Sequence, residues 1–346
     1  MRAARVVRNG EPTEVIEVQD IPVPDVEPGG VRIAVSAAAI NYGDIARCRG
    51  GVASVMAQPP FTLGMEVCGT VEAAGEGAEH LLGRRVVAMC AQSFGGMADF
   101  ALAPATGVFD APPELDDVEA AAFLLPFHTT YLALHVRARL QAGEHLLVVG
   151  GASSLGTAAI QLGVVAGAHV IAIAGGPEKG ELCQKLGAEL AIDHTSDDDI
   201  FDLVMRHTGE HGADVACDMV GGAGTETIWT CMAYEGRYVP VGFNDDTESG
   251  MTGRPLRKVS TGNFSVVGVL LAYMSPSTPM RRFGVNGNPP ERGAEVHTAL
   301  RKLVADGAIR PYVGRRISLG EVATALDDHA NRRTSGRTVV DLSLPA

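Results

Sequence analysis

The stretch VVGGASSLGTAAIQLG, residues 148–163, decides the fold. The apolar run HLLVV at 145–149 leads into a turn of small residues and then into an apolar segment of helical character. Dinucleotide-binding turns have the spacing G-x-G-x-x-G, in which the glycines permit a tight turn, a close approach of the pyrophosphate and packing of the helix on the strand. Gly151 and Gly156 occupy the outer positions, while Ser153 replaces the middle glycine. We expect the helix N-terminus to attract phosphate and the serine hydroxyls to donate to it.

The residues at the end of the second predicted strand indicate which cofactor the chain binds. An NAD site usually places Asp or Glu about 20 residues past the glycines, where it binds the ribose 2′-hydroxyl. Here the run VIAIA ends in Gly175-Gly176-Pro177 without a carboxylate, and Lys179 follows nearby. A cation without a carboxylate suits a 2′-phosphate, so the sequence favours NADPH over NADH. The cofactor contacts predicted in these two turns are Gly151, Ser153, Ser154, Leu155, Gly156, Gly176 and Lys179.

Strand-like and helix-like segments alternate through the middle of the chain. The apolar runs are HLLVVG, HVIAIAG, AELAIDH, ADVACDMVG, GRYVPVGF and FSVVGVLL, with helical segments between the early ones. Continuous apolar runs are typical of parallel strands that are covered on both faces. We therefore predict a doubly wound parallel Rossmann sheet over residues 122–272 that binds NADPH.

The flanking segments have a different pattern. Residues 1–121 contain short alternating strands separated by Pro and Gly, such as VRIAVSAAAI and EVCGTVEAAG, which indicates an antiparallel, barrel-type unit. Residues 273–346 contain two helices and a last strand, GRTVVDLSL, and we expect this segment to return to the first unit and complete it. The predicted fold class is α/β, with a dinucleotide domain inserted into an antiparallel β domain.

Composition excludes several classes of protein. The chain has 346 residues and a net charge of −13, which disfavours nucleic acid and anionic membranes as partners. No apolar run reaches the roughly 20 residues of a membrane span, and the N-terminal segment lacks a signal-peptide pattern. The six cysteines have no CxxC spacing, so we expect reduced, partly buried thiols and a cytoplasmic protein.

The order of these segments resembles the medium-chain dehydrogenase/reductase superfamily, and most of all its zinc-free NADPH:quinone oxidoreductase branch. The resemblance covers essentially the whole chain and implies a GroES-like catalytic domain around a Rossmann domain. It rests on the blocks INYGD (40–44), PFTLGMEVCGTVEAAG (60–75), GGMADFALAP (95–104), EAAAFLLPFHTTYLAL (119–134), GGASSLGTAAIQL (150–162), KLGAELAID (185–193), DMVGG (218–222), GRYVPVGF (236–243) and SGRTVVDL (335–342).

Zinc alcohol dehydrogenases of the superfamily hold a catalytic zinc with Cys, His and Cys. The matching positions here are Asn41, Met65 and Leu125. An amide, a thioether and an alkyl group cannot replace two thiolates and an imidazole. Glu66 is retained, but a single carboxylate is not a metal site, so we predict no metal.

The resemblance assigns roles to four residues near the reacting end of the cofactor. It places Asn41 and Thr129 beside the nicotinamide, with Asp44 supporting the pocket floor and Tyr42 lining the pocket or donating a proton. Read alone, Asn41 is equally a turn-capping amide, and Asp44 reads as a structural rather than a catalytic carboxylate.

Further cofactor contacts follow from the resemblance. Gly242 and Phe243 should lie over the nicotinamide edge, and the segment 267–271, with Val269 and Leu270, should meet the carboxamide. His194 takes a position near the adenine ribose phosphate or caps the strand end. The remaining basic residue, Arg337, either reaches toward the cofactor or is a solvated cation at a strand start.

These expectations favour an NADPH-dependent reductase of quinones or similar α,β-unsaturated carbonyls. One alternative is a trans-2-enoyl thioester reductase, although residues 49–53 lack the aromatic residue that such enzymes often carry there. Another is a non-catalytic NADPH-binding protein of the crystallin type. The apolar run FSVVGVLL ends the predicted sheet, and pairing of two such edges would give a homodimer.

Overall fold

The computed structural model describes residues 1–51, 58–242 and 256–345. The chain folds into two compact units. Residues Met1–Leu125 and Ala272–Ala346 form one of them, called here the split unit because it is built from both ends of the sequence. Residues Pro126–Leu271 form the other, the inserted unit. Among the described residues, no helix combines the length and the apolar character that a membrane span requires.

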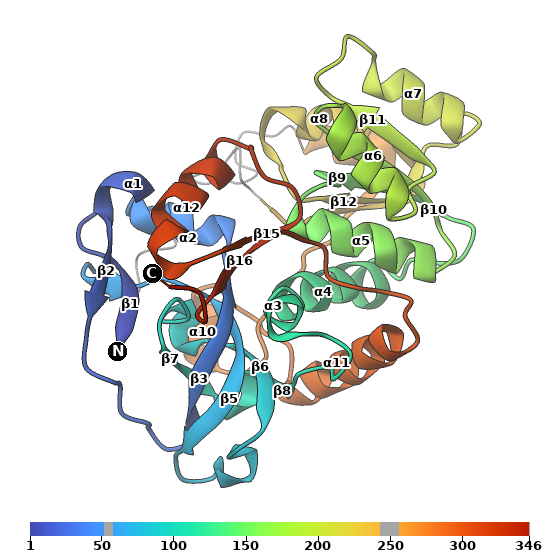
Figure 1. The fold of residues 1–346 in the computed structure, drawn as a ribbon. Helices are drawn as coiled ribbons and strands as arrows, with labels where there is room; N and C mark the ends of the chain where they lie inside the picture. The colour runs from blue at the N-terminus through green and yellow to red at the C-terminus, as the bar shows by residue number, and fades with distance from the viewer. Residues whose placement is uncertain (52–57, 243–255, 346) are drawn as a thin grey trace. The chain divides into compact units, whose positions relative to one another are not determined.

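The split unit is built on two sheets, which are antiparallel apart from one pair of strands (Figure 1). The smaller sheet has the order β2–β1–β4, with β1 (Arg2–Val6), β2 (Ile16–Asp20) and β4 (Phe61–Thr62). The larger sheet has the order β15–β16–β3–β5–β6–β8, and β7 pairs with β3. Its strands are β3 (Gly30–Ala39), β5 (Glu66–Ala74), β6 (Arg85–Met89), β7 (Phe100–Pro104), β8 (Val108–Asp110), β15 (Val313–Ile317) and β16 (Arg337–Asp341). Only the pair β15–β16 is parallel among these.

The last strand, β16, joins the two ends of the sequence. It pairs antiparallel with β3, with Val339 opposite Ala39 and Asp341 opposite Ala37. Every residue of β16 is buried, whereas β3 alternates between buried and half-buried residues, as a strand with one face on the core does. The helices of this unit are α1 (Pro12–Val15), α2 (Tyr42–Cys48), α3 (Asp117–Ala121), α10 (Thr278–Arg282), α11 (Pro290–Ala305) and α12 (Val322–Ala330).

The inserted unit contains a six-stranded sheet of the order β11–β10–β9–β12–β13–β14, in which all described pairs are parallel. Its strands are β9 (His145–Val149), β10 (His169–Ala174), β11 (Leu190–Asp193), β12 (Ala213–Asp218), β13 (Met232–Pro240) and β14 (Ser265–Val266). Its helices are α5 (Ser154–Val165), α6 (Pro177–Lys185), α7 (Ile200–His207), α8 (Thr225–Thr230) and α9 (Arg257–Gly262), and α4 (Leu124–Tyr131) leads into it. The fold class predicted from the apolar runs, a doubly wound parallel sheet beside an antiparallel unit, is confirmed.

One strand is much shorter than the sequence pattern suggests. The run FSVVGVLL predicts a strand over most of 264–271, but β14 covers Ser265 and Val266 alone. One further hydrogen bond, from the Val267 N–H to the Tyr238 carbonyl, continues the contact with β13 at 2.8 Å. Beyond it the apolar residues lie outside regular structure, and the Leu270 side chain is exposed. Hydropathy alone therefore overestimates this strand.

A buried histidine makes the stability of the split unit depend on pH. His297 on α11 stacks on Phe109, with ring centroids 4.8 Å apart, and its Nε2 lies 2.8 Å from the Asp110 carbonyl oxygen. Burial lowers its pKa to about 4, and the Asp110 carbonyl opposes that shift only in part. The unfolded chain takes up a proton at this residue near pH 6.5, whereas the folded chain does so only near pH 4. The contribution of His297 to the free energy of unfolding is therefore fully present above about pH 6.5 and declines as the pH falls toward 4.

We expect His297→Gln to flatten this pH dependence. In the native chain, this one group lowers the free energy of unfolding by up to about 1.4 kcal/mol for each pH unit below about 6.5. Glutamine keeps an amide nitrogen near the ring position but takes up no proton. Urea unfolding measured between about pH 7 and pH 5 should show a smaller loss in the variant than in the native chain. If the native chain and the variant lose equal free energy of unfolding over this pH range, His297 is not the group responsible for the pH dependence.

Candidate functional site

The turn between β9 and α5 has the geometry of a phosphate cradle. Ser153 is the N-cap of α5, and its Oγ accepts a hydrogen bond of 3.1 Å from the Gly156 N–H. The tight turn lies one residue earlier than the motif suggests, because Gly150 has a φ of +81°. The amide groups of the first turn of the helix are therefore presented at the carboxyl end of β9, where anions bind well. Ser153, which replaces the middle glycine of the motif, therefore stabilises the helix N-terminus with its hydroxyl, in addition to the phosphate contact expected of that hydroxyl.

Glycine is required at the ends of this motif for reasons of space. A Cβ on Gly156 would lie 2.1 Å from the Gly150 carbonyl oxygen, so the helix and the turn touch through their backbones. A Cβ on Gly151 would lie 2.9 Å from both the Ala172 Cβ and the Cys183 Sγ. Gly151 thus packs on β10 and α6 rather than forming the turn. The third glycine of the motif performs the role that the sequence predicts for it, close packing of helix on strand.

The loop after β12 packs against the same turn. A Cβ on Gly150 would lie 3.1 Å from the Val220 Cγ2. Asp218, 1% exposed, fixes this loop because its Oδ1 accepts from the N–H groups of Val220 and Gly221 at 2.8 and 2.9 Å. Its Oδ2 accepts from the Tyr238 hydroxyl at 2.6 Å. Strands β9 and β12 are neighbours, and the chain continues from β9 toward one edge of the sheet and from β12 toward the other. The carboxyl ends of these two strands therefore mark the switch point, where doubly wound sheets bind their ligands.

A second tight turn lies at the carboxyl end of β10. Gly176 has a φ of +84° and precedes α6, whose first turn carries Lys179. The Gly176 N–H donates to the Asp193 Oδ1 at 2.8 Å, and the backbone and side chain of Thr195 donate to the same oxygen. These hydrogen bonds lower the pKa of Asp193 to about 2, and the bond from the Gly176 N–H makes the largest contribution. The sequence reading finds no carboxylate at the tip of β10, and the structure brings one there from the next strand.

His194 packs against this second turn. Its backbone N–H donates to the Ala174 carbonyl at 3.0 Å, so it follows the end of β10 closely. A Cβ on Gly175 would lie 2.9 Å from the His194 Nε2, which places the imidazole directly against the turn. Both residues that the sequence predicts beside a 2′-phosphate, Lys179 and His194, therefore belong to neighbouring segments of the inserted unit.

The other predicted contacts of the inserted unit lie on different segments. Gly242 follows β13, and a Cβ there would lie 2.1 Å from the Met219 carbonyl oxygen, so the chain passes close to the loop after β12. Val269 and Leu270 lie in the irregular segment after β14. Thr129 is on α4 and is 8% exposed. Phe243 lies outside the described residues.

In the split unit, Asp44 is a buried carboxylate at the start of α2. It is fully buried, and its Oδ2 accepts from the Asn41 N–H at 2.9 Å. Its Oδ1 lies 3.4 Å from the Arg47 Nη1 and 3.4 Å from the Gly64 N–H. Burial raises the pKa of Asp44, and Arg47 opposes the shift. Asp44 thus completes the capping box of α2 with Asn41 and contacts the backbone of the neighbouring loop at Gly64.

Asn41 belongs to a second buried group that includes Glu66 and Arg337. The Arg337 Nη2 donates to the Asn41 Oδ1 at 2.9 Å and forms a short ion pair with the Glu66 carboxylate. The other oxygen of Glu66 accepts from the Leu125 N–H at 2.8 Å. Glu66 and Arg337 are 1% and 4% exposed, and burial lowers the pKa of Arg337 to about 9, which leaves it protonated at neutral pH.

This arrangement changes the interpretation of Arg337. The sequence offers a cofactor contact or a solvated cation, whereas its guanidinium is buried against Glu66 and Asn41. The prediction that Arg337 is a solvated cation is wrong, because its side chain has almost no exposed surface. The contacts support a positioning role, in which Arg337 fixes the amide of Asn41 and the loop ending at Leu125. Tyr42, next to Asn41, is half-buried and lies 6.1 Å from the His329 ring.

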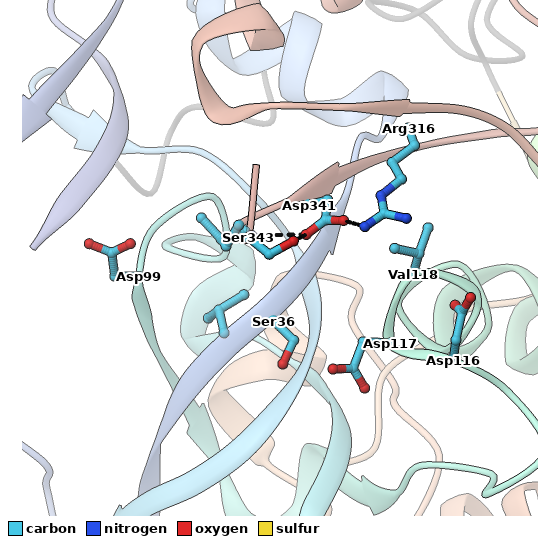
Figure 2. A pocket seen from close by; sticks show the side chains of 10 residues that line it. Ser36, Asp99, Asp116, Asp117, Val118, Arg316, Asp341 and Ser343 are labelled. Carbon is cyan, nitrogen blue, oxygen red and sulfur yellow. Dashed lines mark hydrogen bonds and ion pairs between the residues drawn. The ribbon is translucent and has the colours of Figure 1, made fainter. Parts of the chain in front are cut away.

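A pocket of about 640 Å³ in the split unit contains none of the predicted site residues (Figure 2). Four aspartates line it, namely Asp99, Asp116, Asp117 and Asp341. Arginines pair with three of these carboxylates, and the fourth caps α3. Each of these carboxylates thus has a partner within the split unit.

Sequence reasoning missed several of these groups. Asp218 and Asp193 each end an apolar strand, and an acidic residue in that position is a signal that could have identified them. The link from Arg337 to Glu66 spans 271 residues and leaves no local pattern. All six cysteines are buried free thiols, as the absence of regular spacing predicts.

An antiparallel β unit interrupted by a doubly wound nucleotide-type sheet defines the class of medium-chain dehydrogenases/reductases. Residues 27–113 match the alcohol dehydrogenase GroES-like domain family, and residues 154–282 match the zinc-binding dehydrogenase family. The chain is 32% identical to the quinone oxidoreductase of Lama guanicoe, over 95% of this chain and 93% of that protein. The chain belongs to the quinone oxidoreductase branch of this superfamily.

Two further relatives bear on the chemistry. The mycobacterial protein Rv1454c, solved in complex with NADPH, is 26% identical with a TM-score of 0.84, and the match covers 100% of both chains. The phthioceranic/hydroxyphthioceranic acid synthase of Mycobacterium tuberculosis strain H37Rv is 30% identical over 91% of this chain, which corresponds to 14% of that much longer protein.

The residues at the zinc positions of the superfamily do not fit a metal. The Asn41 Oδ1 accepts a hydrogen bond from Arg337, and Leu125 has no side-chain donor. Met65 offers a thioether, which is a poor ligand for Zn²⁺. No step of the chemistry is therefore assigned to zinc at this position.

Proposed function

We propose that this chain binds NADPH at the β9–α5 turn and transfers a hydride to a quinone or a similar α,β-unsaturated carbonyl, without zinc. Membership of the family makes it an oxidoreductase. The observation that carries the proposal is the turn itself, in which Ser153 caps the helix and Gly156 leaves no space for a side chain. The NADPH complex of the mycobacterial relative supports the choice of cofactor.

The residues of the chain would act by binding and orientation. NADPH supplies the hydride when it is bound. The first turn of α5 would hold the pyrophosphate, and Gly242 and the segment 267–271, with Phe243, are proposed around the nicotinamide. We assign Asn41 and Thr129 to orientation of the reacting groups and Tyr42 to the lining of the acceptor pocket. Asp44 and Arg337 keep Asn41 in place, so that positioning rather than acid catalysis accounts for the rate.

The test of the reaction compares acceptors side by side. The full chain with NADPH should reduce 1,4-benzoquinone or 9,10-phenanthrenequinone faster than crotonyl-CoA. Faster turnover of crotonyl-CoA would favour the second candidate, a trans-2-enoyl thioester reductase, which the match to a segment of the mycobacterial synthase supports. NADPH binding without turnover of any acceptor would favour the remaining candidate, a non-catalytic NADPH-binding protein of the crystallin type.

The preference for NADPH should depend on Lys179. We expect Lys179→Met to weaken NADPH binding roughly tenfold or more while NADH binding changes little, because an ammonium group stabilises only the ligand that carries the 2′-phosphate. Dissociation constants from cofactor fluorescence measure both. Lys185→Met, at the other end of α6, is the matched control, since the Lys185 side chain is 76% exposed. Equal losses for both cofactors in Lys179→Met would contradict the assignment.

We further propose a homodimer formed through the edge of the inserted unit. Strand β14 ends the sheet, and Val266 is 38% exposed there. Pairing of two such edges across a two-fold axis would satisfy their open backbone groups. Light scattering coupled to size-exclusion chromatography should give the mass of a dimer at micromolar concentration. A monomer would overturn this proposal without affecting the others.

A further inference from the structure

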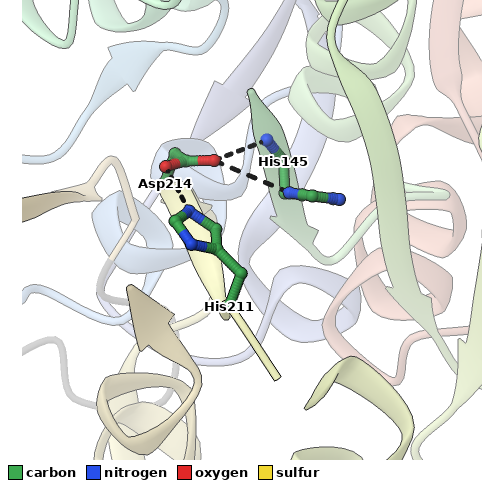
Figure 3. A group of neighbouring side chains, drawn as sticks. All are labelled: His145, His211 and Asp214. Carbon is green, nitrogen blue, oxygen red and sulfur yellow. Dashed lines mark hydrogen bonds and ion pairs between the residues drawn. The ribbon is translucent and has the colours of Figure 1, made fainter. Parts of the chain in front are cut away.

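A second group of polar side chains lies at the amino-terminal edge of the parallel sheet. His145 is the first residue of β9, and Asp214 is the second residue of β12, with His211 in the turn just before it. Strands β9 and β12 are direct neighbours, with Leu146 opposite Val215. The register of the sheet therefore brings the three side chains together (Figure 3). The nucleotide turn is at the opposite end of β9, so this group takes no part in the proposed reaction.

The geometry of the three side chains suits a small cation. The His211 Nε2 lies 2.8 Å from the Asp214 Oδ1, and the His145 Nδ1 lies 3.7 Å from the Asp214 Oδ2. One ligand atom from each residue lies within 4.8 Å of the others. Donors around a tetrahedral zinc ion are separated by about 3.3 Å, given bonds of about 2.0–2.1 Å. Binding of an ion would bring the three donor atoms to this spacing through rotation of their side chains.

The donor types of this group also suit a metal. Two imidazole nitrogens and a carboxylate are ligands that Zn²⁺ binds. The Asp214 Oδ2 accepts a hydrogen bond of 2.8 Å from the His145 backbone N–H, which holds the carboxylate in position.

More imidazoles surround this group. The ring centroid of His169 lies 5.3 Å from that of His145, and His169 is paired with Glu189 at 2.8 Å. His207 lies 3.5 Å from the same carboxylate. The His211 side chain is 52% exposed, so an ion can enter from solvent.

We propose that His145, His211 and Asp214 form a binding site for a divalent transition-metal ion, Zn²⁺ foremost. Two imidazoles and a carboxylate are typical Zn²⁺ ligands, and water completes a tetrahedron. The ion would link the starts of β9 and β12 and the turn that carries His211. Its role is structural: it stabilises the inserted unit at the end of the sheet away from the cofactor. The proposal is independent of the substrate and of NADPH.

The test is a calorimetric titration of the tag-free, EDTA-treated full chain with Zn²⁺ and, separately, with Ni²⁺. We expect one saturable site per chain and a rise in melting temperature that EDTA reverses. His145→Gln and His211→Gln should each weaken Zn²⁺ binding by at least about tenfold. His80→Gln removes an exposed histidine of the split unit and should bind as the native chain does.

The outcomes separate the proposal from its alternatives. Absence of a saturable site in the native chain would overturn it. Binding that the double variant His145→Gln/His211→Gln retains at native affinity would also overturn it, since the ion would then lie elsewhere. Far-UV circular dichroism shows whether the variants fold. If a single variant fails to fold, Asp214→Asn, which keeps one acceptor oxygen for the His145 N–H, provides the same comparison.

Discussion

Gly156→Ala is expected to lower kcat/KM with NADPH on the order of 100-fold or more, because helix α5, which is proposed to hold the phosphates, must move. Alanine normally stabilises a helix relative to glycine by about 1 kcal/mol. Here the new Cβ would lie 2.1 Å from the Gly150 carbonyl oxygen and 2.6 Å from that of Gly151, and backbone atoms cannot rotate away. We expect a net loss of about 1–3 kcal/mol in the stability of the inserted unit.

Gly224→Ala is the matched control for this variant. Gly224 has a φ of −72° and precedes α8 in the same unit, and no atom lies within 4 Å of a Cβ placed there. It should retain native NADPH affinity and stability. Cofactor fluorescence and thermal melting measure both variants. Native affinity in Gly156→Ala would show that the β9–α5 turn is not the phosphate cradle.

Arg337→Met is expected to destabilise the split unit by about 3–5 kcal/mol, because it leaves the Glu66 carboxylate buried without its cation. Burial makes this pair different from the many ion pairs on the surface. Arg333→Met is the control, since the Arg333 side chain is 53% exposed and its pairs with Asp327 and Asp328 are surface ion pairs that contribute little to stability. Chemical denaturation of both variants measures the difference.

A double variant separates the two roles considered for Arg337. Glu66→Gln removes the buried charge and keeps an oxygen for the Leu125 N–H, so Arg337→Met/Glu66→Gln should recover much of the lost stability. If Arg337 only positions its neighbours, this folded double variant binds NADPH as the native chain does and loses kcat through Asn41. A large loss of NADPH affinity in the stable double variant would instead assign Arg337 to the cofactor.

The sequence predicted those features that depend on local patterns. The strands of the inserted unit are continuous apolar runs with helices between them, and buried parallel strands require that composition. The glycine and serine spacing of 151–156 placed the start of α5. The two-residue length of β14 was not predictable, because the apolar run continues past the point where pairing with β13 stops.

The features that were not predicted depend on contacts between distant segments. The carboxylate of Asp193 comes to the β10–α6 turn from the neighbouring strand, and no pattern near Gly176 reveals it. The pairing of Arg337 with Glu66 requires β16 to lie beside β3. The cluster of His145, His211 and Asp214 follows from the adjacency of β9 and β12, which are separated by two other strands in sequence.

The position of β16 between β15 and β3 sets the order in which the chain can fold as it is synthesised. All residues of the inserted unit leave the ribosome as one continuous stretch, so its sheet can form while synthesis continues. The split unit lacks an interior strand, and Glu66 lacks its cation, until residues 337–341 emerge. The part of the molecule that holds Asn41 is therefore completed last, and a chain truncated before β16 would carry an assembled nucleotide domain beside an open, aggregation-prone sheet.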